Sequence, residues 1–308
     1  MIEKIEKLEK NLKSVIKGKD EIIHLVLNAL CCGGNILMDD VPGVGKTTMA
    51  KALALSIDGD FTRVQFTPDL LPSDITGSSI YNPHEAEFRF RRGPIFTNIF
   101  LADEINRASP RTQSALLEAM NEAQITVEGV TYKLEQPFLV IATENPVEYQ
   151  GTYPLPEAQL DRFALEIKIG YPSEKDEVEI LFSKHGRDPL DDIRPVINCR
   201  EICDVQRTVK SLKVEKSVAH YIVKIIRATR EDERVKLGAS PRALIVLYNT
   251  SQAEAFLNKR DFVIPEDVKK LAPIVLSHRI ILENKAKYAG VSKKQIINEI
   301  LDSVSVPV

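Results

Sequence analysis

A glycine-containing loop that ends in lysine and threonine carries the clearest chemical signal in the sequence. It reads Asp40-Val41-Pro42-Gly43-Val44-Gly45-Lys46-Thr47-Thr48. Glycine lets backbone N–H groups turn inward around an anion without a Cβ clash, and a helix that begins directly after such a loop adds its own unpaired N–H groups. Lys46 then reaches the β- and γ-phosphates of a nucleotide, and the Thr47 hydroxyl binds Mg²⁺. The loop from Pro42 to Thr48 is therefore predicted to hold ATP with magnesium.

One position departs from the general phosphate-loop pattern, which begins with glycine. Asp40 stands at that position, and its carboxylate repels phosphates unless it turns outward. Taken alone, the loop is also compatible with a tight turn that opens an ordinary helix. A second element is needed to choose between the two interpretations.

A pair of carboxylates after an apolar run supplies that second element. The run 98–102 is followed directly by Asp103 and Glu104. Asp103 is expected to hold Mg²⁺ through water, and Glu104 to polarise the attacking water as general base. Such a pair is often only a solvated turn, but together with the phosphate loop it favours ATP hydrolysis.

The elements that must position these groups alternate between strands and helices. Short apolar runs predict strands near 35–38, 62–66, 99–102, 138–142 and 165–169, while helical patterns cover 46–57 and 110–123. Two further helices, at 2–15 and 21–29, precede the first strand. Alternation of this kind predicts an α/β fold with a parallel sheet and helices on both faces.

Two insertions, at 78–95 and 124–135, interrupt the alternation. The second reads as a hairpin whose turn lies at Glu128-Gly129. Phe88, Phe90 and Tyr132 lie in these insertions, and two roles stay open for them. They either grip a partner as exposed aromatic side chains or form the small cores of the hairpins themselves.

A domain boundary is predicted at residue 172. The first domain, 1–172, contains the phosphate loop and both insertions. From 173 to 308 the periodic segments are helical, near 174–184, 200–209, 216–231, 241–256 and 266–277. Residues 173–308 are therefore expected to form a smaller helical domain.

Composition narrows the classes of protein that fit. Apolar residues make up 44% and charged residues 28%, and 41 basic residues against 44 acidic ones leave a net charge of −3. This balance gives no electrostatic case for general binding to nucleic acid. The charged N-terminus and the absence of a long apolar run predict a cytoplasmic protein without a membrane span. The four cysteines are interpreted as reduced, buried thiols rather than as a metal site or a redox pair: Cys31, Cys32, Cys199 and Cys203.

Over nearly its whole length the chain resembles the MoxR family of AAA+ ATPases. The most specific stretches are 39–47, Asp103-Glu104-Ile105-Asn106-Arg107-Ala108, and 142–146 with its continuation at 151–163. The family commonly has an acidic residue at the Asp40 position, whereas Glu144 stands where glutamine is more usual. The resemblance implies that residues 1–172 form an AAA+ nucleotide-binding domain and 173–308 its helical lid.

The resemblance also assigns roles to single residues near the nucleotide. Asn145 matches the polar sensor that orients water against the γ-phosphate, with a buried turn asparagine as the alternative. Arg162 matches the arginine finger that reaches the ATP of the adjacent subunit. A salt bridge to Asp161 or Glu157 within the subunit competes with that role, and Arg107 is a second, lower-ranked candidate for the finger.

Two further sites follow from the same resemblance. In the helical domain, Ser240 is expected to cap a helix that begins at Pro241. Arg242 in its first turn matches the second sensor, which contacts the γ-phosphate of its own subunit. Near the N-terminus, Ile16 and Gly18 match the segment that lines the adenine pocket.

These assignments together predict a ring-forming, hexameric, Mg-dependent ATPase that remodels or matures other proteins. The family resemblance implies a protein client or a partner with a von Willebrand A domain. One alternative is a DNA-associated motor or loader that uses the hairpin cations Arg89, Arg91, Arg92 and Lys133, against which the near-neutral composition argues. The other is a nucleotide-gated adaptor with little turnover, against which Glu104 and Asn145 argue.

Overall fold

A parallel sheet forms the centre of the first half of the molecule. The computed structural model describes residues 1–40, 43–145, 152–183 and 188–307. Within these ranges the sheet has five strands in the order β2-β5-β8-β1-β9, and every neighbouring pair is parallel. Their bounds are β1 Ile36–Asp39, β2 Phe61–Gln65, β5 Ile99–Asp103, β8 Leu139–Glu144 and β9 Leu165–Ile167.

Alternate residues of the central strands enter two different hydrophobic clusters. On β1, Ile36 and Met38 pack with helices α1 (Ile2–Val15), α2 (Asp20–Cys32) and α3 (Lys46–Ser56). Leu37 between them faces the cluster that contains Leu116 and Leu117 of α5 (Pro110–Glu122). Successive side chains of a strand point to opposite faces, so each face of the sheet is covered by helices. The predicted α/β fold is thereby confirmed.

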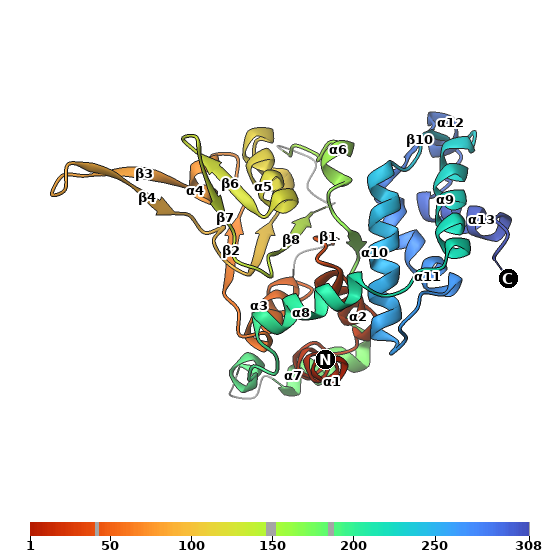
Figure 1. Cartoon of the computed structure of the whole chain (residues 1–308), viewed down its shortest axis with the longest axis horizontal. Helices are drawn as coiled ribbons and strands as arrows, with labels where there is room; N and C mark the ends of the chain where they lie inside the picture. The colour runs from red at the N-terminus through yellow and green to blue at the C-terminus, as the bar shows by residue number, and fades with distance from the viewer. Residues whose placement is uncertain (41–42, 146–151, 184–187, 308) are drawn as a thin grey trace.

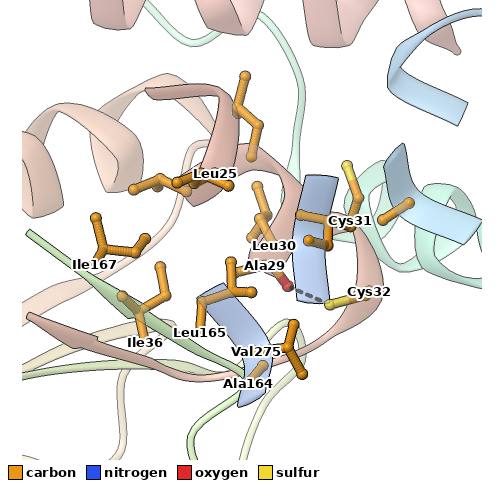
Figure 2. Close-up of a cluster of buried hydrophobic side chains, with 14 of the residues drawn as sticks. Leu25, Ala29, Leu30, Cys31, Cys32, Ile36, Ala164, Leu165, Ile167 and Val275 are labelled. Atoms are coloured by element: carbon orange, nitrogen blue, oxygen red, sulfur yellow. Dashed lines mark hydrogen bonds between the residues drawn. The ribbon is translucent and has the colours of Figure 1, made fainter. Parts of the chain in front are cut away.

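The cluster under α2 also holds the first pair of cysteines. Cys31 and Cys32 are buried in the same cluster as Ile36 and Leu165 of the sheet (Figure 2). Burial raises the pKa of both thiols, which keeps them protonated. Cys199 and Cys203 differ from the expectation, since they are only partly buried on α8 (Cys199–Lys210). All four are free thiols.

The two insertions form antiparallel hairpins. β3 (Gly77–Asn82) follows the short helix α4 (Pro72–Thr76) and pairs with β4 (Glu87–Arg92), while β6 (Gln124–Val127) pairs with β7 (Val130–Lys133). The second hairpin turns at Glu128-Gly129, both with positive φ. The β3–β4 hairpin extends away from the rest of the molecule (Figure 1).

Aromatic side chains join the two hairpins. The rings of Phe90 and Tyr132 stack with centroids 4.1 Å apart, and the Ser79 hydroxyl donates to Glu128 Oε2 at 2.6 Å. Phe88 is different, because 73% of it is exposed. Of the two roles left open by the sequence, packing within the hairpins therefore describes Phe90 and Tyr132. Phe88 contacts the ring of Tyr81 and leaves most of its own surface exposed.

The chain after β9 first packs against the sheet domain and then forms a helical bundle (Figure 1). The 3-10 helix η2 (Pro189–Asp192) contacts α1 and α3, and α8 (Cys199–Lys210) contacts α2 and α10. The remaining elements are α7 Glu174–Ser183, α9 Lys216–Glu231, β10 Val235–Leu237, α10 Pro241–Leu257, α11 Pro265–Leu276, η3 Ser277–Arg279, β11 Ile281–Leu282, α12 Asn284–Tyr288 and α13 Lys293–Ser303. The domain division at residue 172 stays a prediction.

The helical bundle and the sheet domain share buried charged groups as well as apolar ones. Glu254 of α10 is 1% exposed and accepts hydrogen bonds from His24 of α2 and Lys270 of α11. These bonds hold the pKa of Glu254 at about 2 against the opposing effect of burial. Within the described ranges, the helices are too short or too polar to cross a bilayer.

Candidate nucleotide-binding site

The phosphate loop connects the carboxyl end of β1 to the first turn of α3. Gly45 is the N-cap of α3 with φ 95°, and Gly43 has φ 87°. A Cβ at either position would meet nothing within 4 Å, so the backbone conformation rather than crowding requires glycine here. Val44 between them packs against the core. The predicted contact Pro42 lies outside the described residues.

A cavity of about 320 Å³ opens between this loop and the ends of β2, β5 and β8. It contains most of the predicted ATP-binding and catalytic positions. The residues that line this phosphate-loop cavity are Asp40, Gly43, Gly45, Lys46, Thr47, Thr48, Arg63, Gln65, Asp103, Glu104, Thr143 and Asn145.

The Asp40 carboxylate accepts a hydrogen bond from the chain after β9. Its Oδ2 accepts a hydrogen bond from Gly170 N at 2.7 Å, while its backbone oxygen accepts one from Lys46 Nζ at 2.6 Å. Lys46 is 9% exposed. Burial lowers the pKa of Lys46, and the carboxylates of Asp40 and Asp103 act in the opposite direction. The ammonium is thus held at the centre of the loop among acidic groups.

Both oxygens of the Asp103 carboxylate have protein partners. Oδ1 accepts from Thr143 Oγ1 at 2.6 Å, and Oδ2 accepts from Arg63 Nη2 at 2.7 Å and Nε at 3.0 Å. This arrangement fixes the orientation of Asp103 and suits contact with a cation through water.

The oxygen donors in the cavity suit magnesium. The Thr47 hydroxyl and the Asp103 carboxylate line the same space, and Mg²⁺ prefers oxygen ligands and retains several waters. Among the described residues, no cluster of three His, Cys, Asp or Glu side chains is arranged to hold a metal. The fit therefore depends on Thr47 and Asp103 together with the phosphates of a nucleotide.

Glu104 has a backbone conformation that is uncommon for a residue with a side chain, with φ 56° and ψ 52°. Its amide donates to Thr143 Oγ1 at 2.8 Å. Its Oε2 accepts from Gln65 Nε2 at 2.7 Å and from Arg107 Nη1 at 2.9 Å. Glu104 is thus fixed at both its backbone and its carboxylate. Arg107, the lower-ranked candidate for a finger, pairs here with the acid of its own subunit.

Comparisons with known proteins agree with this geometry. The sequence profile of the ATPase family associated with various cellular activities (AAA) matches residues 35–165, and that of the AAA lid domain matches residues 227–300. Chaperone MoxR1 of Mycobacterium tuberculosis is 39% identical over 305 residues, which covers 96% of this chain and 80% of that protein. This chain belongs to the MoxR family of AAA+ ATPases.

Two further relatives span nearly the whole length. The Bacillus subtilis protein YeaC is 51% identical over 302 residues, covering 98% of this chain and 94% of that protein. A crystal structure of a Cytophaga hutchinsonii protein superposes with a TM-score of 0.92 at 40% identity, covering 100% of this chain and 96% of that one. The MoxR-family fold, sheet domain and lid together, therefore extends along the chain.

The residue before Asn145, the predicted sensor, belongs to an acidic group. Asn145 follows β8, is 7% exposed and lines the phosphate-loop cavity. Glu144 pairs in register with Asp39 of β1. Burial, together with Asp39 and Glu166, raises the pKa of Glu144 to about 7. Lys168 compensates part of this charge through its ion pair with Asp39 at 2.6 Å.

The two remaining MoxR-family catalytic candidates lie together in a different place. Arg162 and Arg242 line a second cavity of about 350 Å³, and neither lines the phosphate-loop cavity of its own subunit. Ser240 accepts from Ala243 N at 3.2 Å and so caps α10 as predicted. The residues of this arginine cavity are Ser114, Leu117, Glu118, Asn121, Glu122, Gln159, Arg162 and Arg242.

The salt bridges that compete with a finger role for Arg162 are not formed. Arg162 Nη1 donates to the backbone oxygen of Leu117 at 2.9 Å. In the described part of the chain Arg162 makes no ion pair with Asp161 or Glu157. Asp161 instead accepts from Arg279 and from Ser240.

Ile16 and Gly18 line neither of the two cavities. Ile16 ends α1 and packs against the core. Gly18 has φ 68°, and a Cβ there would lie 2.0 Å from Asp176 at the start of α7. The predicted adenine contact of these two residues therefore stays a prediction. Arg63, Gln65 and Thr143 are site residues that the sequence analysis did not identify.

Proposed function

We propose that this MoxR-family chain binds Mg-ATP in the phosphate-loop cavity and hydrolyses it when a neighbouring copy supplies Arg162. One observation supports this most strongly. Lys46, Thr47, Asp103, Glu104 and Asn145 come from separate stretches of sequence, yet all line one cavity. The cavity thus contains a cation that can bind phosphate, oxygen ligands for magnesium, a general base and a polar sensor.

Each group has a defined task in this mechanism. The loop N–H groups and Lys46 bind the phosphates. Thr47 and Asp103 would hold Mg²⁺, which would neutralise charge on the phosphates. Glu104, fixed by Gln65 and Arg107, accepts the proton of the attacking water, and Asn145 orients that water. Thr48 adds its backbone amide in the first turn of α3.

The position of the arginine cavity supports completion by a second subunit. Because Arg162 and Arg242 lie side by side outside the phosphate-loop cavity, we assign both to the nucleotide of the adjacent copy. This differs from the sequence-based assignment of Arg242 to its own nucleotide. Permanently charged guanidinium groups suit developing charge on the γ-phosphate, and such residues contribute about 10³–10⁵ in rate.

The biological role we infer is that of a chaperone-like remodelling or maturation factor working as a hexameric ring. The relative named Chaperone MoxR1 supports the chaperone part of this role. The exposed pair Tyr81 and Phe88 on the β3–β4 hairpin, 50% and 73% exposed, offers an apolar contact for a protein client. A partner with a von Willebrand A domain stays part of this proposal.

The DNA-associated alternative has weaker support in the structure. Arg89 forms an ion pair with Glu85 at 2.7 Å, and the Arg92 guanidinium lies 4.9 Å from the centroid of the Phe96 ring. These cations therefore have partners within the hairpin region.

The adaptor alternative predicts negligible phosphate release, which a steady-state assay measures.

The test is the specific ATPase activity measured against protein concentration. Completion by a second copy predicts slow turnover in dilute solution and a rise in turnover per subunit through the assembly range. Activity per subunit that does not change while light scattering shows assembly would contradict the trans role.

A further inference from the structure

Arg279 is a buried cation whose partners lie on the turn that carries Arg162. It follows α11 in η3, and its side chain has no exposed surface. Its Nε donates to Asp161 Oδ1 at 3.0 Å and its Nη2 to the Asp161 backbone oxygen at 3.2 Å. Further hydrogen bonds go to the backbone oxygens of Phe163, Ala164 and Val275. The fork of Arg279 thus holds the backbone on both sides of Arg162.

Asp161 extends this contact to the helix that carries Arg242. While Oδ1 accepts from Arg279, Oδ2 accepts from the Ser240 hydroxyl at 2.8 Å. The same hydroxyl oxygen caps α10 by accepting from Ala243 N, and Arg242 is in the first turn. One carboxylate therefore connects the turn before Arg162 to the N-terminus of the helix with Arg242.

Burying the charge of Arg279 costs free energy, and its hydrogen-bond partners offset part of that cost. Burial lowers the pKa of Arg279 to about 10, and Asp161 acts in the opposite direction, so the group stays charged at neutral pH. Apolar residues of similar volume are often as stable as a buried ion pair. Unlike apolar packing, the hydrogen-bonded pair of Arg279 and Asp161 fixes the relative orientation of its two side chains.

We propose that Arg279 and Asp161 are positioning residues that hold Arg162 and Arg242 side by side for the nucleotide of the neighbouring subunit. The Arg162 side chain is held in addition by its hydrogen bond to Leu117 O. Two like charges in one cavity repel each other, so they need such external support. The inference rests on the proposed trans role of Arg162.

Steady-state kinetics of Arg279→Lys and Asp161→Asn test the positioning. Lysine keeps the charge but loses the fork, and asparagine keeps the size but loses the ion pair. We expect kcat to fall about 10–100-fold, as for displaced catalytic groups, with ATP affinity and KM unchanged. Arg260→Lys is the matched control, because Arg260 pairs with buried Asp267 at the other end of α11. Its kcat is expected to stay the same. Unchanged kcat in both test variants would overturn the inference.

Mixed oligomers separate positioning from general damage. In a mixture of Arg279→Lys with Glu104→Gln, one kind of interface joins an intact Glu104 to intact arginines. Activity should therefore recover, as is expected for the mixture of Arg162→Ala with Glu104→Gln. Asp161→Asn is used in the same way if Arg279→Lys does not fold. If activity recovers in the mixture that contains Arg162→Ala but not in the mixture that contains Arg279→Lys, the positioning role is overturned and the trans site is retained. No recovery in either co-assembled mixture would remove the trans site and the inference with it.

Discussion

The two cavities of the molecule are assembled by different physical means. The phosphate-loop cavity uses the carboxyl ends of neighbouring parallel strands, so the formation of one sheet brings its residues together. The arginine cavity joins α5, the turn after α6 (Glu157–Leu160) and the first turn of α10, and a buried ion pair from the lid holds these parts. The first brings together the residues predicted to bind phosphate, magnesium and the attacking water. The second contains Arg162 and Arg242, which do not line the first.

This difference indicates that nucleotide binding and ATP turnover have different structural requirements. Nucleotide binding should depend on one chain, while turnover should depend on two chains meeting. Substitutions in the two cavities should therefore change different measured quantities. The predictions below use this division, from the largest expected effect to the smallest.

Arg162→Ala should separate the cavities most clearly. Loss of the trans guanidinium should lower kcat by about 10³–10⁵-fold, while the Kd for Mg-ATP stays the same because Arg162 does not line the phosphate-loop cavity. Arg200→Ala, which removes an exposed arginine at the start of α8, is the control. Phosphate release and a fluorescent-nucleotide titration measure the two quantities. A large rise in Kd would place Arg162 in the binding site of its own subunit.

Glu104→Gln should lower kcat by about 10²–10⁴-fold through loss of the general base. Glutamine keeps an acceptor for Gln65 and Arg107, so ATP binding is expected to persist and the ATP-bound assembly to accumulate. Analytical ultracentrifugation with ATP measures that accumulation. Retention of parental turnover would remove Glu104 from the chemical step.

Lys46→Ala should act on binding instead. Removal of a buried cation that pairs with phosphate is expected to cost about 2–5 kcal/mol, or roughly 30-fold to several thousand-fold in Kd. Lys51→Ala on the exposed face of α3 is the matched control. Isothermal titration with Mg-ATP measures both variants. Equal affinity for the two would show that the loop does not hold phosphate.

Glu144→Gln should produce the smallest effect, and one that depends on pH. The pKa of Glu144 is raised from 4.5 to about 7 by burial, Asp39 and Glu166, so its ionisation in the fold costs stability as pH rises through this window. The variant should match the parent near pH 4.5 and become more stable toward pH 8, by at most about 3 kcal/mol. Thermal unfolding between pH 4.5 and 8 measures the difference. A Tm difference that does not change with pH would contradict the assignment.

The sequence predicts the phosphate-loop cavity well because its signals are local. The apolar runs of β1, β5 and β8 are buried on both faces. The loop and Asn145 directly follow strands, and Asp103 is the last residue of β5. Arg63 and Gln65 were missed since their place depends on the register of β2 against β5, with Gln65 beside Asp103. Register between strands that are distant in the sequence cannot be read from a single pattern.

The arginine cavity was predicted only in part for a related reason. The resemblance identifies Arg162 and Arg242 singly, but their proximity depends on contacts among Asp161, Ser240 and Arg279. These residues are far apart in the sequence and carry no shared spacing. Tertiary packing of the lid, rather than local propensity, brings them together. The short strands β10 and β11 were missed because they hold too few residues for a periodic signal.

The most direct test of the division between the cavities is a mixing experiment. Arg162→Ala and Glu104→Gln are each nearly inactive alone, but in a mixed assembly an intact Glu104 meets an intact Arg162 across an interface. ATPase activity should therefore reappear on mixing and reach a maximum at intermediate ratios. Activity that stays at the level of the separate variants, in mixtures shown to co-assemble, would contradict completion of the site by a second copy.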